Sequence, residues 1–232
     1  MVVRALDVAS SLAATLARLA SAARVGALGP RPEKLLVLYE FEGCPYCRKV
    51  REALSILDLD ALVLPCPKGG ERYRPEVVAR GGKAQFPYLI DPNTGKEMYE
   101  SDEIVAYLFR HYGDGRVPLL LAPGFLTDAT AGLASIVRAG RGTRARPSRK
   151  PALPIELYSF EASPFCRIVR EALCCLELPY EVRNVAKGSR RRGAFVERSG
   201  RMMVPYLADP NTGVEMFESA DIVTYLEETY GS

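Results

Sequence analysis

The pattern of apolar and polar residues predicts a chain of alternating strands and helices. An apolar run over Leu35–Tyr39 has the length of a buried strand, and apolar residues at helical spacing follow over Cys47–Leu57. The stretch Asp91–Gly95, Asp-Pro-Asn-Thr-Gly, predicts a tight turn between two short strands. The other predicted elements are strands at Ala61–Leu64, Tyr88–Ile90 and Glu97–Glu100 and helices at Tyr73–Arg80 and Ser101–Tyr112, the last with Ser101 as its N-cap.

The same series of elements occurs twice along the chain. Leu38–Arg48 recurs as Leu157–Arg167, and the turn Asp91–Gly95 returns unchanged as Asp209–Gly213. Further matches join Val50–Leu54 to Val169–Leu173, Phe86–Leu89 to Val204–Leu207 and Ile104–Leu108 to Ile222–Leu226. Each copy has about eighty residues, which is enough to fold as a unit. The order β-α-β-α-β-β-α is that of the thioredoxin fold, so the chain is predicted to be α/β with two tandem thioredoxin-like domains.

Four parts make up the predicted domain organisation. They are an N-terminal amphipathic or transit-like segment (1–33), a first domain (34–113), a helix with an Arg-rich linker (114–153) and a second domain (154–232). Within the linker, Phe125–Val137 is predicted to form one helix. In the N-terminal segment, Leu12, Leu16, Leu19 and Ala23 share one helical face, and Arg4, Asp7, Ser11 and Arg18 share another. This segment is interpreted either as an organellar transit peptide or as a helix packed on the first domain.

Charge and hydropathy exclude some classes of function. Of the 232 residues, 48% are hydrophobic, which is ordinary for a globular protein, and the net charge of +3 gives no reason to expect a nucleic acid partner. Basic residues crowd Arg138–Lys150 and Arg190–Arg192. Both clusters are interpreted either as solvated loops or as docking sites for an acidic protein or a membrane surface. No apolar run is long enough to predict a membrane-spanning helix.

Six cysteines and a single histidine limit the candidate chemistry. Cys44 and Cys47 form the only C-x-x-C pair, so a four-cysteine zinc site lacks its second half and no metal is expected. The pair lies where a predicted strand passes through a short loop into a helix, whose free N–H groups favour a thiolate. The residues therefore indicate a redox pair in a reducing compartment.

The C-x-x-C motif at Cys44–Cys47, the isolated Phe86–Pro87 and the Glu100–Ser101 pair occur together in a known family. With them, the first copy resembles glutaredoxin and, more closely, the N-terminal domain of glutathione transferases. From about Leu35 onward, the chain is similar to plant and algal chloroplast proteins that carry two such domains in tandem. This resemblance implies glutathione as co-substrate and a soluble protein in the chloroplast stroma or at the thylakoid.

The resemblance assigns the chemistry of the first copy to its two thiols. Cys44 is the implied nucleophile, and Cys47 is the implied resolving thiol that closes a disulfide with it. Arg48 and Lys49 are expected to add positive charge near the Cys44 thiolate. The alternative of two inert thiols stays open at this point.

The resemblance also implies a glutathione site beside these thiols. Pro87 is expected to be a cis-proline, and the backbone of Phe86 is expected to pair with the cysteinyl part of glutathione. Glu100 and Ser101 are expected to hold the γ-glutamyl group, with the serine and nearby N–H groups at its carboxylate and Glu100 at its amine. The alternatives are an ordinary turn proline at Pro87 and a plain helix cap at Ser101.

The second copy departs from this pattern at the position of the nucleophile. Ser163 stands where Cys44 stands, so only Cys166 keeps a thiol and the dithiol mechanism is lost. One interpretation is a transferase-like site in which the Ser163 hydroxyl stabilises the thiolate of bound glutathione. The other is a domain kept for packing or partner binding. The residues of this candidate second site are Ser163, Cys166, Val204, Pro205, Glu218 and Ser219, with Arg201 beside them.

These inferences lead to a glutathione-dependent thiol–disulfide oxidoreductase of the glutaredoxin type, with its active site in the first copy. Protein disulfides or small disulfides are the expected substrates, because neither copy is followed by a segment expected to form the all-helical C-terminal domain of transferases. The alternatives are a non-catalytic chloroplast scaffold that docks through its Arg-rich linker, a serine-type transferase in the second copy and a glutathione-ligated iron–sulfur carrier.

Overall fold

The computed structural model describes residues 5–16, 22–122 and 140–232. The first half holds α1 (Ala5–Leu16), β1 (Leu36–Glu40), α2 (Pro45–Ile56), β2 (Ala61–Pro65), α3 (Arg74–Gly81), β3 (Tyr88–Asp91), β4 (Lys96–Met98) and α4 (Ser101–Tyr112). The second half holds β5 (Ile155–Ser159), α6 (Pro164–Cys175), β6 (Tyr180–Asn184), α7 (Arg192–Ser199), β7 (Tyr206–Asp209), β8 (Val214–Phe217) and α8 (Ser219–Tyr230). The predicted helix Phe125–Val137 lies outside the described residues. No helix among those described is long and apolar enough to cross a membrane.

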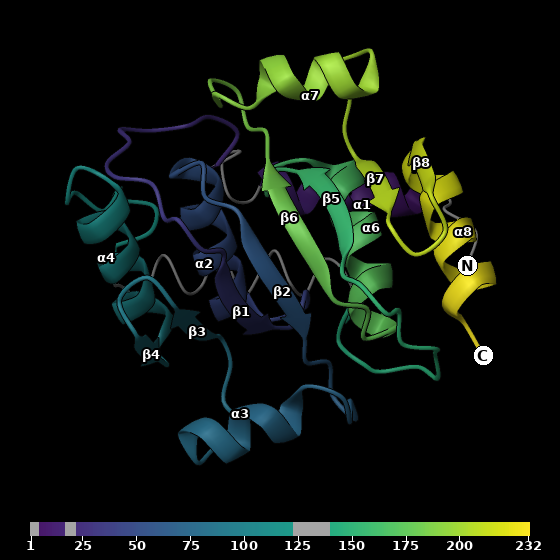
Figure 1. Cartoon of the computed structure of the whole chain (residues 1–232), viewed down its shortest axis with the longest axis horizontal. Coiled ribbons are helices and arrows are strands. Elements are labelled where there is room, and N and C mark those ends of the chain that lie inside the picture. Colours follow the sequence, from purple (N-terminus) through teal and green to yellow (C-terminus); the bar gives the residue numbers. More distant parts are fainter. Residues whose placement is uncertain (1–4, 17–21, 123–139) are drawn as a thin grey trace.

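The strands of the described residues form one mixed sheet, in the order β4-β3-β1-β2-β6-β5-β7-β8 (Figure 1). In each half the first two strands are parallel, the third pairs antiparallel with the first, and the fourth pairs antiparallel with the third. This architecture confirms the predicted α/β, thioredoxin-like fold class. One boundary is corrected: β4 ends at Met98 and does not extend to Glu100, where the backbone turns into a left-handed φ of 64°.

Alternating side chains give the two faces of the sheet different cores. In β1, Leu36 and Leu38 join a large core under α2 and α4, whereas Val37 and Tyr39 face a smaller core under α3. The large core continues into the second half under α6 and α8, and α7 covers a second small core. Figure 1 shows α7 at the top of the view and α3 at the bottom.

The two halves meet edge to edge, where β2 and β6 pair antiparallel. The register joins Ala61 to Val182, Leu62 to Glu181 and Val63 to Tyr180. Leu62 and Glu181 occupy equivalent positions of the repeat, so a local two-fold axis passes through this pair. The contact is therefore of the isologous kind that joins identical subunits in a dimer.

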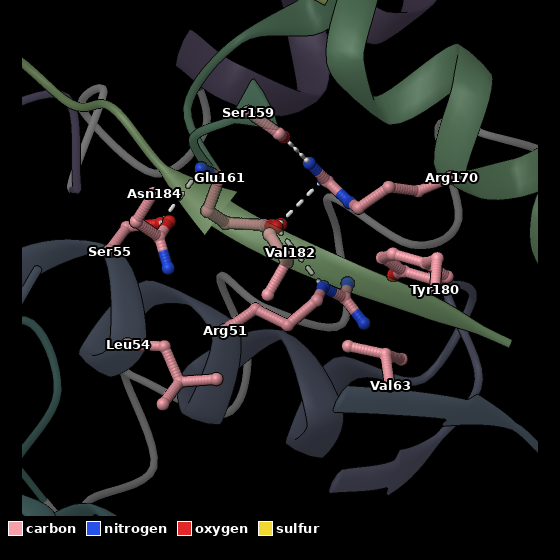
Figure 2. Close-up of a pocket in the computed structure, with 10 residues that line it drawn as sticks. All are labelled: Arg51, Leu54, Ser55, Val63, Ser159, Glu161, Arg170, Tyr180, Val182 and Asn184. Carbon is pink, nitrogen blue, oxygen red and sulfur yellow. Dashed lines mark hydrogen bonds and ion pairs between the residues drawn. The ribbon is translucent and has the colours of Figure 1, made fainter. Parts of the chain in front are cut away.

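An ionic network is buried between the halves beside this axis (Figure 2). Arg51 Nε donates to Glu161 Oε2 at 3.1 Å, and its equivalent Arg170 Nε donates to Glu42 Oε2 at 3.0 Å. Figure 2 shows the Glu161 carboxylate between the Arg51 and Arg170 guanidinium groups, and Arg170 also pairs with Glu161 at 2.7 Å. All four side chains are at most 6% exposed. Each half therefore supplies a charge that the other half needs, because an unpaired buried charge costs several kcal/mol.

Two extended arms also cross between the halves, and the local two-fold axis relates one arm to the other. In the arm before β1, Val25 N donates to Lys187 O of the second half at 2.9 Å. In the arm before β5, Ala145 N donates to Lys68 O of the first half, also at 2.9 Å. The repeated structure thus includes arms that lie outside the predicted domain ranges, and the division into domains stays a prediction.

The N-terminal helix α1 packs on the second half, not on the first domain as one interpretation expected. Ser11 is fully buried; its Oγ donates to Pro164 O at 2.8 Å, and Arg167 Nη1 donates to Ser11 O at 2.6 Å. Leu12 is 46% exposed. The predicted apolar face is therefore not the side that packs at this point, because the carbonyl of Pro164 and the guanidinium of Arg167 provide polar partners for Ser11.

Several arginines of the two basic clusters have partners within the protein. Arg146 makes a bidentate contact with Glu227, with N–O distances of 2.6 and 2.7 Å. Arg191 reaches across the halves to Asp60, with Nε and Oδ2 3.1 Å apart. These side chains are therefore engaged in the fold, which neither a solvated loop nor a docking arm predicts.

Candidate functional site

Cys44 is the N-cap residue of α2. Its backbone is extended, with φ −79° and ψ 123°, and its sulfur accepts a hydrogen bond from the Cys47 N–H at 3.3 Å. Pro45 occupies the first helical position. The N–H of that position makes no hydrogen bond within a helix, so proline loses none there. The loop therefore aims the Cys44 sulfur at the free N–H groups of the helix.

The two thiols of the motif differ in acidity. The hydrogen bond with the Cys47 side chain, helped by the N–H groups of Cys47 and Tyr46, lowers the pKa of Cys44, although burial opposes it. Burial raises the pKa of Cys47 well above its ordinary value, and the hydrogen bond with Cys44 raises it further. Cys44 keeps 4% of its surface exposed and Cys47 keeps none, and both are free cysteines. The pair thus offers one nearly buried thiol with a lowered pKa in front of one fully buried thiol whose pKa is raised.

Arg48 and Lys49, which were expected to add positive charge near Cys44, are not among the main causes of this acidity. Arg48 is buried, and among the charges that act on its guanidinium the strongest attraction comes from Glu161, in the network between the halves. Lys49 forms an ion pair with Asp102 at the start of α4. The hydrogen bonds of Cys44 are the main cause that lowers its pKa, and both cations have acidic partners elsewhere.

A pocket of about 390 Å³ opens beside the half-exposed ring of Tyr46. The residues that line it are Tyr46, Gln85, Phe86, Pro87, Glu100 and Ser101. The structure therefore brings together the four residues that the resemblance implies for glutathione, although their roles in binding stay predictions. Gln85 is an addition that sequence reasoning missed, and its position directly before Phe86 is the only signal that points to it.

The Phe86–Pro87 peptide bond that borders this pocket is cis, which confirms the expected geometry. The ring of Phe86 meets Phe41 edge to face, with centroids 6.3 Å apart, and the Arg74 guanidinium lies 4.8 Å above it. Phe41 directly follows β1 and leads into the thiol loop. These contacts therefore hold the wall of the pocket against the loop that carries Cys44.

Glu100 and Ser101 begin α4 in an unusual backbone geometry. Glu100 has φ 64° and ψ 109°. Residues other than glycine seldom adopt this backbone conformation, and those that do are often found at functional sites. Glu100 is the N-cap residue and no side chain caps the helix, so the prediction of Ser101 as a cap is wrong. The turn at Glu100 makes Ser101 the first helical residue instead. Ser101 and the first turn of α4 therefore border the pocket, beside a Glu100 carboxylate that accepts from Gln85 Nε2 at 2.6 Å.

The second half repeats the position of the nucleophile without its thiol. Ser163 is the N-cap residue of α6, and its Oγ accepts from the Cys166 N–H at 3.3 Å. Cys166 is fully buried, and burial raises its pKa. This half therefore has a buried thiol of low reactivity and no partner thiol at the accessible position.

The backbone of the second candidate site matches that of the first, but its side chains differ. The Val204–Pro205 bond is cis, Glu218 has φ 66°, and Ser219 is the first residue of α8. Met203 stands where the first half has a glutamine, so the hydrogen bond to the glutamate carboxylate has no counterpart here. Arg201 lies over an aromatic ring, 4.4 Å from its centroid. The backbone of a binding site thus remains, with fewer polar contacts than in the first half.

Comparison with known proteins places this site in a family. The family model described as the N-terminal domain of glutathione S-transferase matches residues 38–122 and again residues 157–232. Among solved structures, a Bombyx mori glutathione transferase is 28% identical over 36% of this chain and 38% of its own, with a TM-score of 0.33. A trimeric glutathione transferase of Leishmania is 14% identical over 84% of this chain and 68% of its own, with a TM-score of 0.30. No curated protein matches the chain.

Within the described residues, no three His, Cys, Asp or Glu side chains are grouped as ligands for a metal ion. The chain spans less than half the length of the Bombyx mori enzyme. The matched segments nevertheless cover more than half of this chain, once in each half. The protein therefore belongs to the family of glutathione S-transferase N-terminal domains.

Proposed function

We propose that the protein is a glutathione-dependent thiol–disulfide oxidoreductase of the glutaredoxin type, with its active site in the first half. The observation that carries this proposal is the position of Cys44. Its sulfur lies at a helix N-terminus with a lowered pKa, and the pocket lined by Phe86, Glu100 and Ser101 adjoins its loop. A thiolate at such a position is suited to attack a disulfide.

The reaction proceeds by two exchanges at the thiol pair. The Cys44 thiolate attacks a substrate disulfide, so that a mixed disulfide forms and one substrate thiol leaves. Cys47 then attacks the Cys44 sulfur and releases the second thiol, which leaves the Cys44–Cys47 disulfide. Two glutathione molecules reduce this disulfide and leave as glutathione disulfide, so electrons and atoms balance.

Glutathione binds in the pocket through the first turn of α4. The Ser101 hydroxyl and the neighbouring N–H groups hold the γ-glutamyl carboxylate, and Glu100 faces its amine. The Phe86 backbone pairs with the cysteinyl unit, which directs the glutathione sulfur toward Cys44. Gln85 supports this placement, because its amide already holds the Glu100 carboxylate.

Substitution of single cysteines tests the proposal. Cys44→Ser is expected to abolish glutathione-coupled reduction of a small disulfide, because the attacking thiolate is lost. Cys166→Ser is the matched control from the second half, and it is expected to leave the rate nearly unchanged. Equal losses in the two variants would refute the assignment of the active site.

Substrate and compartment belong to the same proposal. Protein disulfides or small disulfides are the partners, and the chloroplast, in the stroma or at the thylakoid, is the compartment. This assignment rests on the resemblance of the sequence to tandem-domain chloroplast proteins. The second half acts as the structural partner of the first, since its Glu161 pairs with the buried Arg51.

A further inference from the structure

Glu40 is a buried carboxylate on the face of β1 that α2 covers. It continues the alternation of Leu36 and Leu38, which point into the core beneath this helix. The residue is 1% exposed, and its carboxylate forms an ion pair with Arg51 of α2. Cys47 and Arg51 are four residues apart on one helical face, about 6 Å between their Cβ atoms. Glu40 therefore reaches the helix within one turn of the resolving thiol.

The second half shows that this strand position can contact the equivalent thiol. Ser159 is the counterpart of Glu40, and Cys166 is the counterpart of Cys47. The Ser159 hydroxyl hydrogen-bonds the Cys166 thiol and lies 3.3 Å from Arg170 Nη1. Because a glutamate side chain is longer than a serine, a carboxylate at this position has the reach for both the arginine and the thiol; Glu40 pairs with Arg51, and its charge acts on Cys47.

The carboxylate at this strand position occurs only in the half that has two thiols. Glu42 and Arg51 have the identical counterparts Glu161 and Arg170, so this part of the buried network is repeated. Glu40 is replaced by a serine in the half whose nucleophile is also a serine. The network is thus formed in the second half without a carboxylate at this position. Arg51 already has Glu161 as its partner, as Arg170 has Glu42, so Glu40 adds a further carboxylate in the half with two thiols.

The surroundings of Glu40 suit proton exchange near neutral pH. Burial raises its pKa to about 7, against the attraction of Arg51 and with the repulsion of Glu42. The titratable and charged groups that act with it are Cys44 at the N-cap of α2, Cys47 and Arg51 of α2, Arg170 and Cys174 of α6, the loop residues Glu42, Glu161 and Cys66, and Tyr180 of β6. The Cys47 thiol beside it is protonated at neutral pH, because burial raises its pKa. A base is therefore needed before this thiol can attack.

We propose that Glu40 accepts the proton of Cys47, directly or through one water, when Cys47 resolves a mixed disulfide on Cys44. The inference rests on the proposed function. The Cys47 proton passes to the Glu40 carboxylate as the Cys47 sulfur bonds to the Cys44 sulfur. The bond between Cys44 and glutathione breaks, and glutathione leaves as a thiolate that takes a proton from solvent. Glu40 then returns its proton to solvent, so the step needs no further oxidant or reductant.

The test follows the resolving step in the full-length protein. Reduced protein is mixed rapidly with glutathione disulfide, and acid-quenched samples are weighed by mass spectrometry to follow loss of the Cys44–glutathione adduct across the neutral pH range. In the native protein we expect the rate to rise with a midpoint near pH 7. In Glu40→Gln we expect a loss on the order of 100-fold at neutral pH. The rate should recover only at alkaline pH, where Cys47 ionises without help.

Two variants separate this role from a structural one. Glu161→Gln removes another carboxylate of the same network and is expected to keep a midpoint, moved to lower pH because the repulsion of Glu161 that raises the pKa of Glu40 is lost. Glu40→Asp keeps a carboxylate, so the rate of the resolving step is expected to keep a pH midpoint. This variant also provides the test if Glu40→Gln fails to fold. A native midpoint that persists in Glu40→Gln would overturn the role of Glu40 alone. If no glutathione adduct forms on Cys44 in Cys47→Ser, the proposed function fails together with this inference.

Discussion

At the scale of single residues, Asp91 explains why one five-residue turn is repeated without change. Its carboxylate is fully buried and accepts hydrogen bonds from the Asn93 N–H at 2.8 Å and from Tyr107 and Tyr112 hydroxyls at 2.6 Å each. Asp209 makes the same contacts in the second half, with Asn211, Tyr225 and Tyr230. The motif thus ties the hairpin turn to the last helix and is structural, not chemical.

Asp91→Asn is expected to lower the free energy of unfolding by about 2 kcal/mol, because two hydroxyl hydrogen bonds to a charged acceptor are weakened. Burial opposes ionisation, but the hydrogen bonds from Tyr107, Tyr112 and Asn93 lower the pKa of Asp91 below its ordinary value. Its contribution to stability is therefore present above about pH 4 and is lost as pH falls further. Urea unfolding at neutral and acidic pH measures this.

The matched controls are Asp209→Asn, with a similar expected loss, and the exposed Asp114→Asn, with little change. The difference in stability between native protein and Asp91→Asn should shrink on acidification. A difference that grows at low pH would contradict the role given to the Asp91 carboxylate.

Residue type and spacing predicted the thiol pair at a strand–loop–helix junction, and the family resemblance implied the cis-proline and four of the residues around the pocket. They did not predict where Arg48 and Lys49 point, since that depends on partners brought from the other half and from α4. Gln85 was missed for the same reason: its value lies in a contact with Glu100, fifteen residues away in sequence.

At the scale of elements, periodicity located helices well and their partners poorly. The range of α4 was predicted to the residue, because a change of pattern after Glu100 and a glycine after Tyr112 mark its ends. The element on which α1 packs was not predicted. An amphipathic pattern indicates that one face of a helix is covered, but it does not identify the element that covers it. Ser11 shows the limit: a polar position became buried because α6 supplies a carbonyl group.

The pairing of β2 with β6 was likewise outside the reach of the pattern. Ala61–Pro65 reads as a buried apolar strand, and its burial requires a neighbour on each edge as well as on each face. Only the assembled sheet shows that the other half provides this neighbour. An unpaired β2 would expose a strand edge, which proteins avoid.

At the scale of the whole molecule, the two halves are joined as a dimer is joined. The strand pairing, the ion pairs and the arms all exchange equivalent residues across one axis. The first half therefore depends on the second, and the serine-bearing site in the second half does not need to be active for that half to be retained.

Separation of the halves tests this dependence. Residues 1–122 and 140–232, produced as two chains, are expected to form a one-to-one complex when expressed together, because Arg51 and Glu161 pair between them. Each chain alone is expected to aggregate or self-associate, since it exposes a strand edge and an unpaired buried charge that costs several kcal/mol. Native mass spectrometry measures the association, and a stable folded monomer of either chain would contradict this account.

The central claim is that Cys44 is an activated thiolate at the head of a dithiol site. Its pKa is measured most directly from the pH dependence of alkylation by iodoacetamide, with peptide mass spectrometry to separate Cys44 from the other five cysteines. We expect a midpoint for Cys44 below about 8.5, the value of an unperturbed thiol. We also expect an upward shift in Cys47→Ala, where the hydrogen bond from the Cys47 side chain is lost. A midpoint for Cys44 at or above about 8.5 in the native protein would contradict the central claim.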